Sequence, residues 1–229
     1  MLQPVEDILA LFFPEYCSGC HSALSGAEKA ICTDCRNHLP KAGFHNDPNN
    51  LVEKLFWGRV PLIMATGFLR FAKEGIVQKL LHDLKYRHAL EVGEVLGRLF
   101  AAELVSTPRF GGVDVIIPVP LHPHKQKQRG YNQCDPIVYG MSEVLHIPCS
   151  HALGRVVANS SQTRKGRFER WINVDSIFSV SGANELQGKH VLLVDDVITT
   201  GSTIASCAEA LLKVDGLKLS VGTLAFPMN

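Results

Sequence analysis

The chain has 229 residues, of which 46% are hydrophobic and 20% charged, and its net charge is +1. This composition is typical of a globular protein with a sizeable core, and it excludes a molecule whose whole surface attracts nucleic acid. The sequence has no run of the roughly 18 apolar residues needed to cross a bilayer. Glu6 and Asp7 stand where a secretory signal would carry basic residues, which favours a cytoplasmic protein with reduced thiols.

The N-terminal region combines a short predicted helix, residues 5–13, with two closely spaced pairs of cysteines. The pairs are CSGC and CTDC, formed by Cys17, Cys20, Cys32 and Cys35. Two such pairs can bring four thiolates to one tetrahedral zinc ion, and a fully occupied sulfur shell predicts a structural rather than a catalytic metal. Two disulfides or four free thiols are the alternatives, and the neighbouring His21 is a competing ligand.

The other cysteines are scattered and are predicted to be buried and structural: Cys134, Cys149 and Cys207. The turn-rich segment 41–50 resembles a linker. It predicts a boundary between a helix and zinc-knuckle segment, residues 1–45, and a larger domain, residues 46–229.

The larger domain alternates short apolar strands with amphipathic helices. Strands are predicted at 62–71, 113–120, 188–194 and 217–224, and helices at 74–85, 89–104, 135–145 and 202–214. This alternation indicates an α/β fold with a mainly parallel sheet covered on both faces. Ligands of such sheets gather beyond the carboxyl ends of the strands.

The stretch VLLVDDVITTGST, residues 191–203, places Asp195 and Asp196 at such a strand end. A loop of hydroxyls and one glycine follows and leads into a helix, an arrangement that favours a bound phosphate. Two carboxylates beside a phosphate are consistent with a ribose, because they can accept hydrogen bonds from its 2′ and 3′ hydroxyls. The alternative, a simple helix N-cap, explains one or two of these residues but not the paired acids.

This stretch resembles the phosphoribosyl pyrophosphate (PRPP) signature of type I phosphoribosyltransferases, in which two acids follow apolar residues and precede T-T-G-x-T. A second segment, PVPLHPHKQKQRGYNQ, follows the strand predicted at 113–120 and carries Lys125, Lys127 and Arg129. Arginine suits phosphate through paired hydrogen bonds, whereas a solvated loop is the alternative for the lysines. His122 and His124 lie nearby, and a solvated loop is also the favoured interpretation for them.

A third segment supplies further polar side chains: Arg155, Gln162, Arg164, Arg167, Arg170 and Asn173. The double CxxC, the PVPLHPHKQKQRGYNQ segment, the third segment and LLVDDVITTGST occur in this order over nearly the whole chain. Together they resemble the ComF family of competence-associated, phosphoribosyltransferase-like proteins. The resemblance implies a zinc-knuckle segment joined to a type I phosphoribosyltransferase fold, with a link to DNA uptake or processing.

The resemblance also implies chemistry at C1 of PRPP, with Mg²⁺ bridging diphosphate and ribose oxygens. Asp195 and Asp196 would hold the ribose, and Arg129 would steady the leaving diphosphate, from a loop that closes. The 5′-phosphate would be bound by Thr199, Thr200, Gly201, Ser202 and Thr203. The diphosphate turn would consist of Pro118, Val119, Pro120 and Leu121.

No residue stands out as a general base, so the acceptor is not identified by the sequence. Three hypotheses follow from the motifs and the resemblance. The protein is a phosphoribosyltransferase, or a single-stranded DNA-binding component that works with a DNA-uptake helicase, or a regulator that senses PRPP without turnover.

Overall fold

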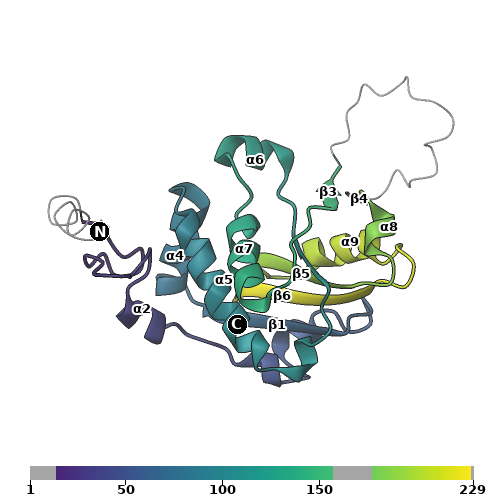
Figure 1. Ribbon diagram of the computed structural model, residues 1–229, viewed down its shortest axis with the longest axis horizontal. Coiled ribbons are helices and arrows are strands. Elements are labelled where there is room, and N and C mark those ends of the chain that lie inside the picture. Colours follow the sequence, from purple (N-terminus) through teal and green to yellow (C-terminus); the bar gives the residue numbers. More distant parts are fainter. Residues whose placement is uncertain (1–13, 157–176, 228–229) are drawn as a thin grey trace.

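The computed structural model describes residues 14–156 and 177–227, and a four-stranded parallel sheet forms the centre of this part of the chain (Figure 1). The strand order is β1-β6-β5-β2, and each neighbouring pair runs parallel. The strands span Met64–Phe71 (β1), Val115–Pro118 (β2), His190–Val197 (β5) and Lys218–Pro227 (β6). The predicted parallel α/β fold is confirmed.

Helices and one small hairpin surround this sheet. The α-helices span Thr33–Asn37 (α2), Leu51–Lys54 (α3), Ile76–Tyr86 (α4), Leu90–Val105 (α5), Pro123–Arg129 (α6), Cys134–Leu145 (α7), Ala183–Leu186 (α8) and Ser202–Leu211 (α9). Two 3₁₀ turns cover Phe44–Asn46 (η1) and Pro108–Phe110 (η2), and an antiparallel hairpin pairs Leu153–Arg155 (β3) with Phe178–Val180 (β4).

Alternating side chains of β5 reach two separate cores. Leu192 and Val194 belong to a buried cluster with residues of α4, α5 and α7. Val191 and Leu193 belong to a second cluster with residues of α9 and the β3–β4 hairpin. Because successive strand residues point to opposite faces, the continuous apolar run of β5 is explained by burial on both sides.

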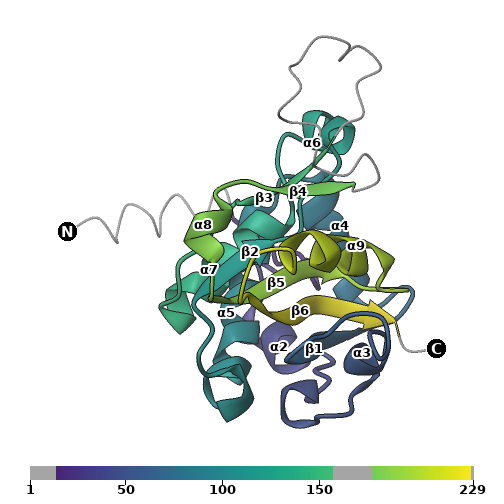
Figure 2. The same cartoon turned by 90° about the vertical axis from the view of Figure 1, so that its right-hand side faces the viewer.

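Helices α5 and α7 lie side by side and approach closely at two glycines (Figures 1 and 2). An added Cβ at Gly97 would overlap the carbonyl oxygen of Ile137, and one at Gly140 would overlap that of Glu94. The two backbones are therefore in direct contact, which fixes α7 and the residues at its start relative to the sheet.

Two strand and helix boundaries differ from the sequence prediction in ways that bear on function. β5 continues through Asp195 and Asp196 to Val197, so both acids lie within the last residues of the strand rather than after it. The stretch after β2 forms a helix, α6, instead of a loop. Pro123 stands in its first turn and the His122 side chain accepts a hydrogen bond from the His124 amide, 3.2 Å away, which are standard helix-start features.

The segment predicted as a linker packs against the edge of the sheet. The Ala42 amide donates to the Phe68 carbonyl oxygen, 2.8 Å away, and the Arg70 amide donates to that of Pro40, also at 2.8 Å. The buried Asn50 side chain caps α3 and donates to the Ala65 carbonyl oxygen at 2.8 Å. The division at residues 45 and 46 stays a prediction, and the helix expected at residues 5–13 lies outside the described residues.

Among the described helices, none is both long and apolar enough to span a membrane.

Candidate sugar-phosphate site and cysteine cluster

The expected ligand-binding edge forms where β2 and β5 end next to each other. Pro118 is the register partner of Val194, so the residues that follow both strands start from the same edge of the sheet. The structure thereby brings together three of the predicted parts: the paired acids, the loop 199–203 and the turn 118–121.

The two acids at the end of β5 are nearly covered by neighbouring side chains. Asp195 is 8% and Asp196 5% exposed. The Lys85 ammonium lies 2.5 Å from Asp196 Oδ2, and the Cys134 thiol donates to Asp195 Oδ1 over 3.7 Å. Asp195 Oδ1 also accepts the Asp196 amide at 2.9 Å.

Burial and the neighbouring Asp196 carboxylate raise the pKa of Asp195 well above its usual range. Burial likewise raises the pKa of the Cys134 thiol, with the Asp195 charge adding to the effect. Cys134 therefore stays a protonated hydrogen-bond donor beneath the acids. The two acids thus differ in their partners: Asp196 lies next to a lysine, whereas Asp195 lies next to a neutral thiol.

The loop after β5 leaves its hydroxyls at the surface. Thr199, Thr200, Ser202 and Thr203 are exposed, while the preceding Ile198 is buried and anchors the loop. A hollow of about 40 Å³ is lined by Asp195 and residues 197–204.

Gly201 starts the ten-residue helix α9 in the left-handed conformation, with φ of 74°. A side chain there would be strained, and its Cβ would stand 3.1 Å from the Phe56 ring. The first amides of a helix lack acceptors within the helix, and together with the hydroxyls they suit a phosphate.

The turn after β2 has fewer free amides than the sequence suggests. Pro118 and Pro120 have no N–H, and the Val119 amide donates to the Val194 carbonyl oxygen at 2.8 Å. Asn132 donates to the Val119 carbonyl oxygen at 3.0 Å. Of the four residues 118–121, Leu121 is therefore the one whose backbone N–H could donate to a diphosphate.

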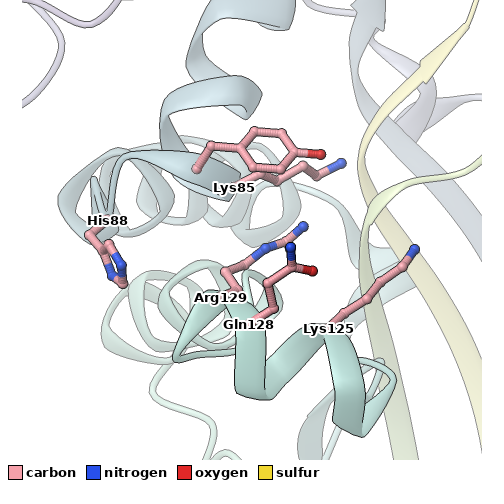
Figure 3. Close-up of a pocket in the computed structure, with 6 residues that line it drawn as sticks. Lys85, His88, Lys125, Gln128 and Arg129 are labelled. Atoms are coloured by element: carbon pink, nitrogen blue, oxygen red, sulfur yellow. The ribbon is translucent and has the colours of Figure 1, made fainter.

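Arg129 is the last residue of helix α6, so the expectation of a flexible loop is corrected. Its guanidinium donates to the Gln133 side-chain oxygen and lies 5.5 Å from the centre of the Tyr86 ring. A pocket of about 290 Å³ lies between α6 and the end of α4 (Figure 3). Its lining is basic and partly aromatic: Lys85, Tyr86, His88, Lys125, Gln128 and Arg129.

The four N-terminal cysteines converge as predicted. Their sulfur atoms all lie within 4.8 Å of one another, and the Sγ atoms of Cys20 and Cys32 are 3.7 Å apart. Bonds of about 2.3 Å to a tetrahedral zinc ion place the sulfurs roughly 3.8 Å apart, so the cluster fits this metal. The cysteines are free, which rules out the alternative of two disulfides in this structure.

The environment favours thiolate at Cys17 and Cys20, whereas burial raises the pKa of Cys35. The Cys17 sulfur accepts the amides of Gly19 and Cys32, at 3.4 and 3.3 Å. A hydrogen bond with Ser22 lowers the pKa of Cys20 to about 6. Because thiolate is the metal-binding form of cysteine, both features support a bound cation.

Comparison with known proteins agrees with the fold. The phosphoribosyl transferase domain family matches residues 134–228. The DNA utilization protein YhgH of Escherichia coli K12 is 31% identical over 210 residues, which cover 90% of this chain and 87% of that protein. Competence protein F of Haemophilus influenzae is 28% identical, covering 93% of this chain and 98% of that protein. The chain belongs to the ComF family.

Other relatives of this ComF protein match over shorter stretches. Competence protein ComFC of Bacillus subtilis is 33% identical over 43% of this chain and 38% of that protein. Among solved structures, the glutamine PRPP amidotransferase of B. subtilis has a TM-score of 0.42 and 16% identity, over 61% of this chain and 30% of that one.

Sequence reasoning missed several residues of the ComF site. Lys85 only ends a predicted helix and Tyr86 follows it, although the run KYRH, residues 85–88, is a basic and aromatic cluster. Arg59 donates to the Thr200 carbonyl oxygen at 3.0 Å and so supports the loop of residues 199–203, and no local pattern predicts this contact. Cys134 was expected to be buried, but not beneath the acids.

The third polar segment contributes little to the described structure. The Arg155 guanidinium lies 5.3 Å from the centre of the Phe178 ring in the β3–β4 hairpin. The other members of that segment lie outside the described residues: Gln162, Arg164, Arg167, Arg170 and Asn173.

Proposed function

We propose that this ComF protein binds PRPP, or a closely related ribose phosphate, across the carboxyl ends of β2 and β5. The observation that carries the proposal is the junction of two acids with a hydroxyl-rich loop at the start of α9. Asp195 and Asp196 would accept the ribose hydroxyls. The 5′-phosphate would lie over the hydroxyls and amides of residues 199–203.

The remaining parts of PRPP would extend from the acids toward the basic pocket. With its phosphate at α9 and its diol at the acids, the sugar has its C1 atom on the side of β2 and α6. Leu121, Arg129 and Lys125 then supply donors and positive charge for the diphosphate. In a transferase reaction the bond from C1 to the diphosphate oxygen breaks, diphosphate leaves with the electron pair, and a nucleophile bonds to C1.

The acids would serve this reaction electrostatically. As the bond to diphosphate breaks, positive charge develops on the sugar ring, and a nearby carboxylate stabilises it. Their oxygens, which lie within 4.8 Å of each other and of the Cys134 sulfur, are the hard donors that suit Mg²⁺. Magnesium bound with PRPP would neutralise part of the diphosphate charge.

A calorimetric titration with PRPP and Mg²⁺ tests the proposal. We expect the wild type to bind, and Asp195→Asn/Asp196→Asn to lose roughly a hundredfold or more in affinity, because each acid loses a charge-assisted hydrogen bond. Asp215→Asn, at an exposed carboxylate far from the site, is the matched control and should bind as the wild type does. Wild-type and double-variant proteins that bind PRPP equally would exclude this site.

Release of diphosphate from bound PRPP separates an enzyme from a sensor. Diphosphate appearing with a candidate acceptor, and not with the double variant, assigns a phosphoribosyltransferase activity. Tight binding without release over the same time assigns a PRPP-sensing regulator.

We further propose that the protein acts in DNA uptake or processing, as the names of its relatives suggest. The basic pocket supports a contact with single-stranded DNA, because Tyr86 is 68% exposed beside Lys125 and Arg129 and offers a base a stacking surface. Binding through these cations would weaken steeply with added salt. Filter binding across salt, with Tyr86→Ala and Lys125→Ala, distinguishes this role, and salt-independent retention would contradict it.

A further inference from the structure

Lys85 contacts the paired acids although no sequence motif includes it. Its ammonium lies 2.5 Å from Asp196 Oδ2, the lysine side chain is 24% exposed, and the aspartate side chain is 7% exposed. A buried carboxylate without a partner is strongly destabilising. Lys85 therefore gives the nearly buried Asp196 carboxylate a partner of opposite charge.

The same lysine also faces the basic pocket. Figure 3 shows Lys85, at the end of α4, opposite Lys125, Gln128 and Arg129 on α6. Its ammonium thus stands at the boundary between the acids, where the ribose diol would bind, and the pocket, where the diphosphate would extend. A ligand that occupies both parts would meet Lys85 between its hydroxyls and its anionic group.

At this boundary a positive charge would reduce the repulsion between PRPP and the two acids most strongly. The diphosphate carries several negative charges and approaches two carboxylates, so their repulsion has to be screened for binding to occur. A magnesium ion bound with PRPP would screen it, and so would an ammonium held at the same boundary. The position of Lys85 gives the protein a fixed cation there before any ligand arrives.

We propose that Lys85 is a positioning residue that supplies this positive charge, so that PRPP binding depends only partly on Mg²⁺. The inference rests on the proposed PRPP function and deepens it. In the wild type, the Lys85 ammonium shifts from its ion pair with Asp196 toward the ribose and diphosphate oxygens. Without Lys85, the same affinity requires magnesium.

Calorimetric titration of the zinc-loaded chain with PRPP, in magnesium-free buffer and at saturating Mg²⁺, tests the inference. We expect Lys85→Met to lose roughly tenfold to a hundredfold in affinity without magnesium, and less than about threefold with it. Lys79→Met is the matched control, because Lys79 is an exposed lysine on the same helix and should show no loss in either buffer. If Lys85 had a purely structural role, saturating Mg²⁺ would not restore the PRPP affinity of Lys85→Met.

Each other outcome overturns the inference. An equal loss in both buffers would make Lys85 an ordinary phosphate contact, and no loss would make it a structural partner of Asp196. Should Lys85→Met fail to fold, Lys85→Gln retains a donor without the charge and should show the same dependence on magnesium. A wild type that binds PRPP in neither buffer would refute the proposed function itself, whereas binding only with magnesium would refute the Lys85 inference alone.

Discussion

Asp195 and Asp196 are adjacent in β5 yet have different partners. Asp196 faces the Lys85 ammonium, whereas Asp195 faces the neutral Cys134 thiol and the other carboxylate. A sugar diol that reaches Asp196 has to share or displace Lys85. A hydroxyl group would therefore meet a different environment at each acid. We expect Asp195→Asn alone and Asp196→Asn alone to lower the affinity for PRPP by different factors.

The raised pKa of Asp195 predicts a pH-dependent effect on stability. The unfolded carboxyl titrates near pH 3.9, whereas the folded one titrates higher, so the folded protein binds more protons between these two pKa values. The free energy of unfolding therefore falls as the pH rises through that window. An asparagine side chain cannot ionise, so we expect Asp195→Asn to raise Tm by a few degrees at pH 7 and to change it little at pH 4.

Thermal unfolding of ligand-free protein from pH 4 to pH 8 measures this difference. Asp215→Asn, at an exposed position, should follow the wild type throughout. A variant that melts at or below the wild-type temperature at pH 7 would show that burial of the Asp195 charge is not destabilising.

The residues of the site could be predicted from the sequence where they lie within one motif. The acids and residues 199–203 are contiguous, so the strand, loop and helix order identifies them together. Lys85, Arg59 and Cys134 could not be found in this way, because they approach β5 and its loop from other parts of the chain. Only the packing of α4, α7 and the segment after α3 against the sheet brings them near.

At the scale of elements, strongly periodic segments were predicted well. The predicted bounds agree closely with the structure for the elements that have a clear apolar pattern, which are β1, α4, α5, α7 and β6. α6 was missed because its seven residues contain no apolar stripe and begin at a proline. Its start depends on Pro123 and on the His122 cap, which are local features of a helix N-terminus rather than a periodic pattern.

The cysteine cluster is expected to hold one zinc ion per chain and to stabilise the segment around α2. Cys17, Cys32 and Cys35 are buried in the same cluster as residues of α4 and α5, so metal loss would expose apolar surface. We expect chelation, or Cys17→Ser, to lower Tm by roughly 5 °C or more. Hydrogen exchange should increase in residues 14–39 before it does in β5.

Metal analysis of the purified chain measures its zinc content and so tests the expected one ion per chain. Cys149→Ser alters a cysteine outside the cluster and should keep both the zinc content and the melting temperature. A wild-type chain that carries no zinc and does not respond to chelation would contradict the assignment.

At the scale of the whole molecule, the site is formed where separate layers meet. The sheet supplies the acids, the loop of residues 199–203 leads into α9, and α4 and α6 supply the basic pocket. The glycine contact between α5 and α7 fixes the start of α7, and with it Cys134, beneath the acids. The sequence motifs predicted the acids, the loop and, in the pocket, Lys125 and Arg129. The contribution of α4 to the pocket depends on how the helices assemble.

A crystal structure of the protein with PRPP and Mg²⁺ would show directly whether the ribose phosphate binds at the ends of β2 and β5. We expect the ribose hydroxyls within hydrogen-bond distance of Asp195 and Asp196, the 5′-phosphate against residues 199–203, and the diphosphate toward Arg129. A complex in which the acids keep only their contacts with Lys85 and Cys134, while the ligand lies elsewhere, would contradict it.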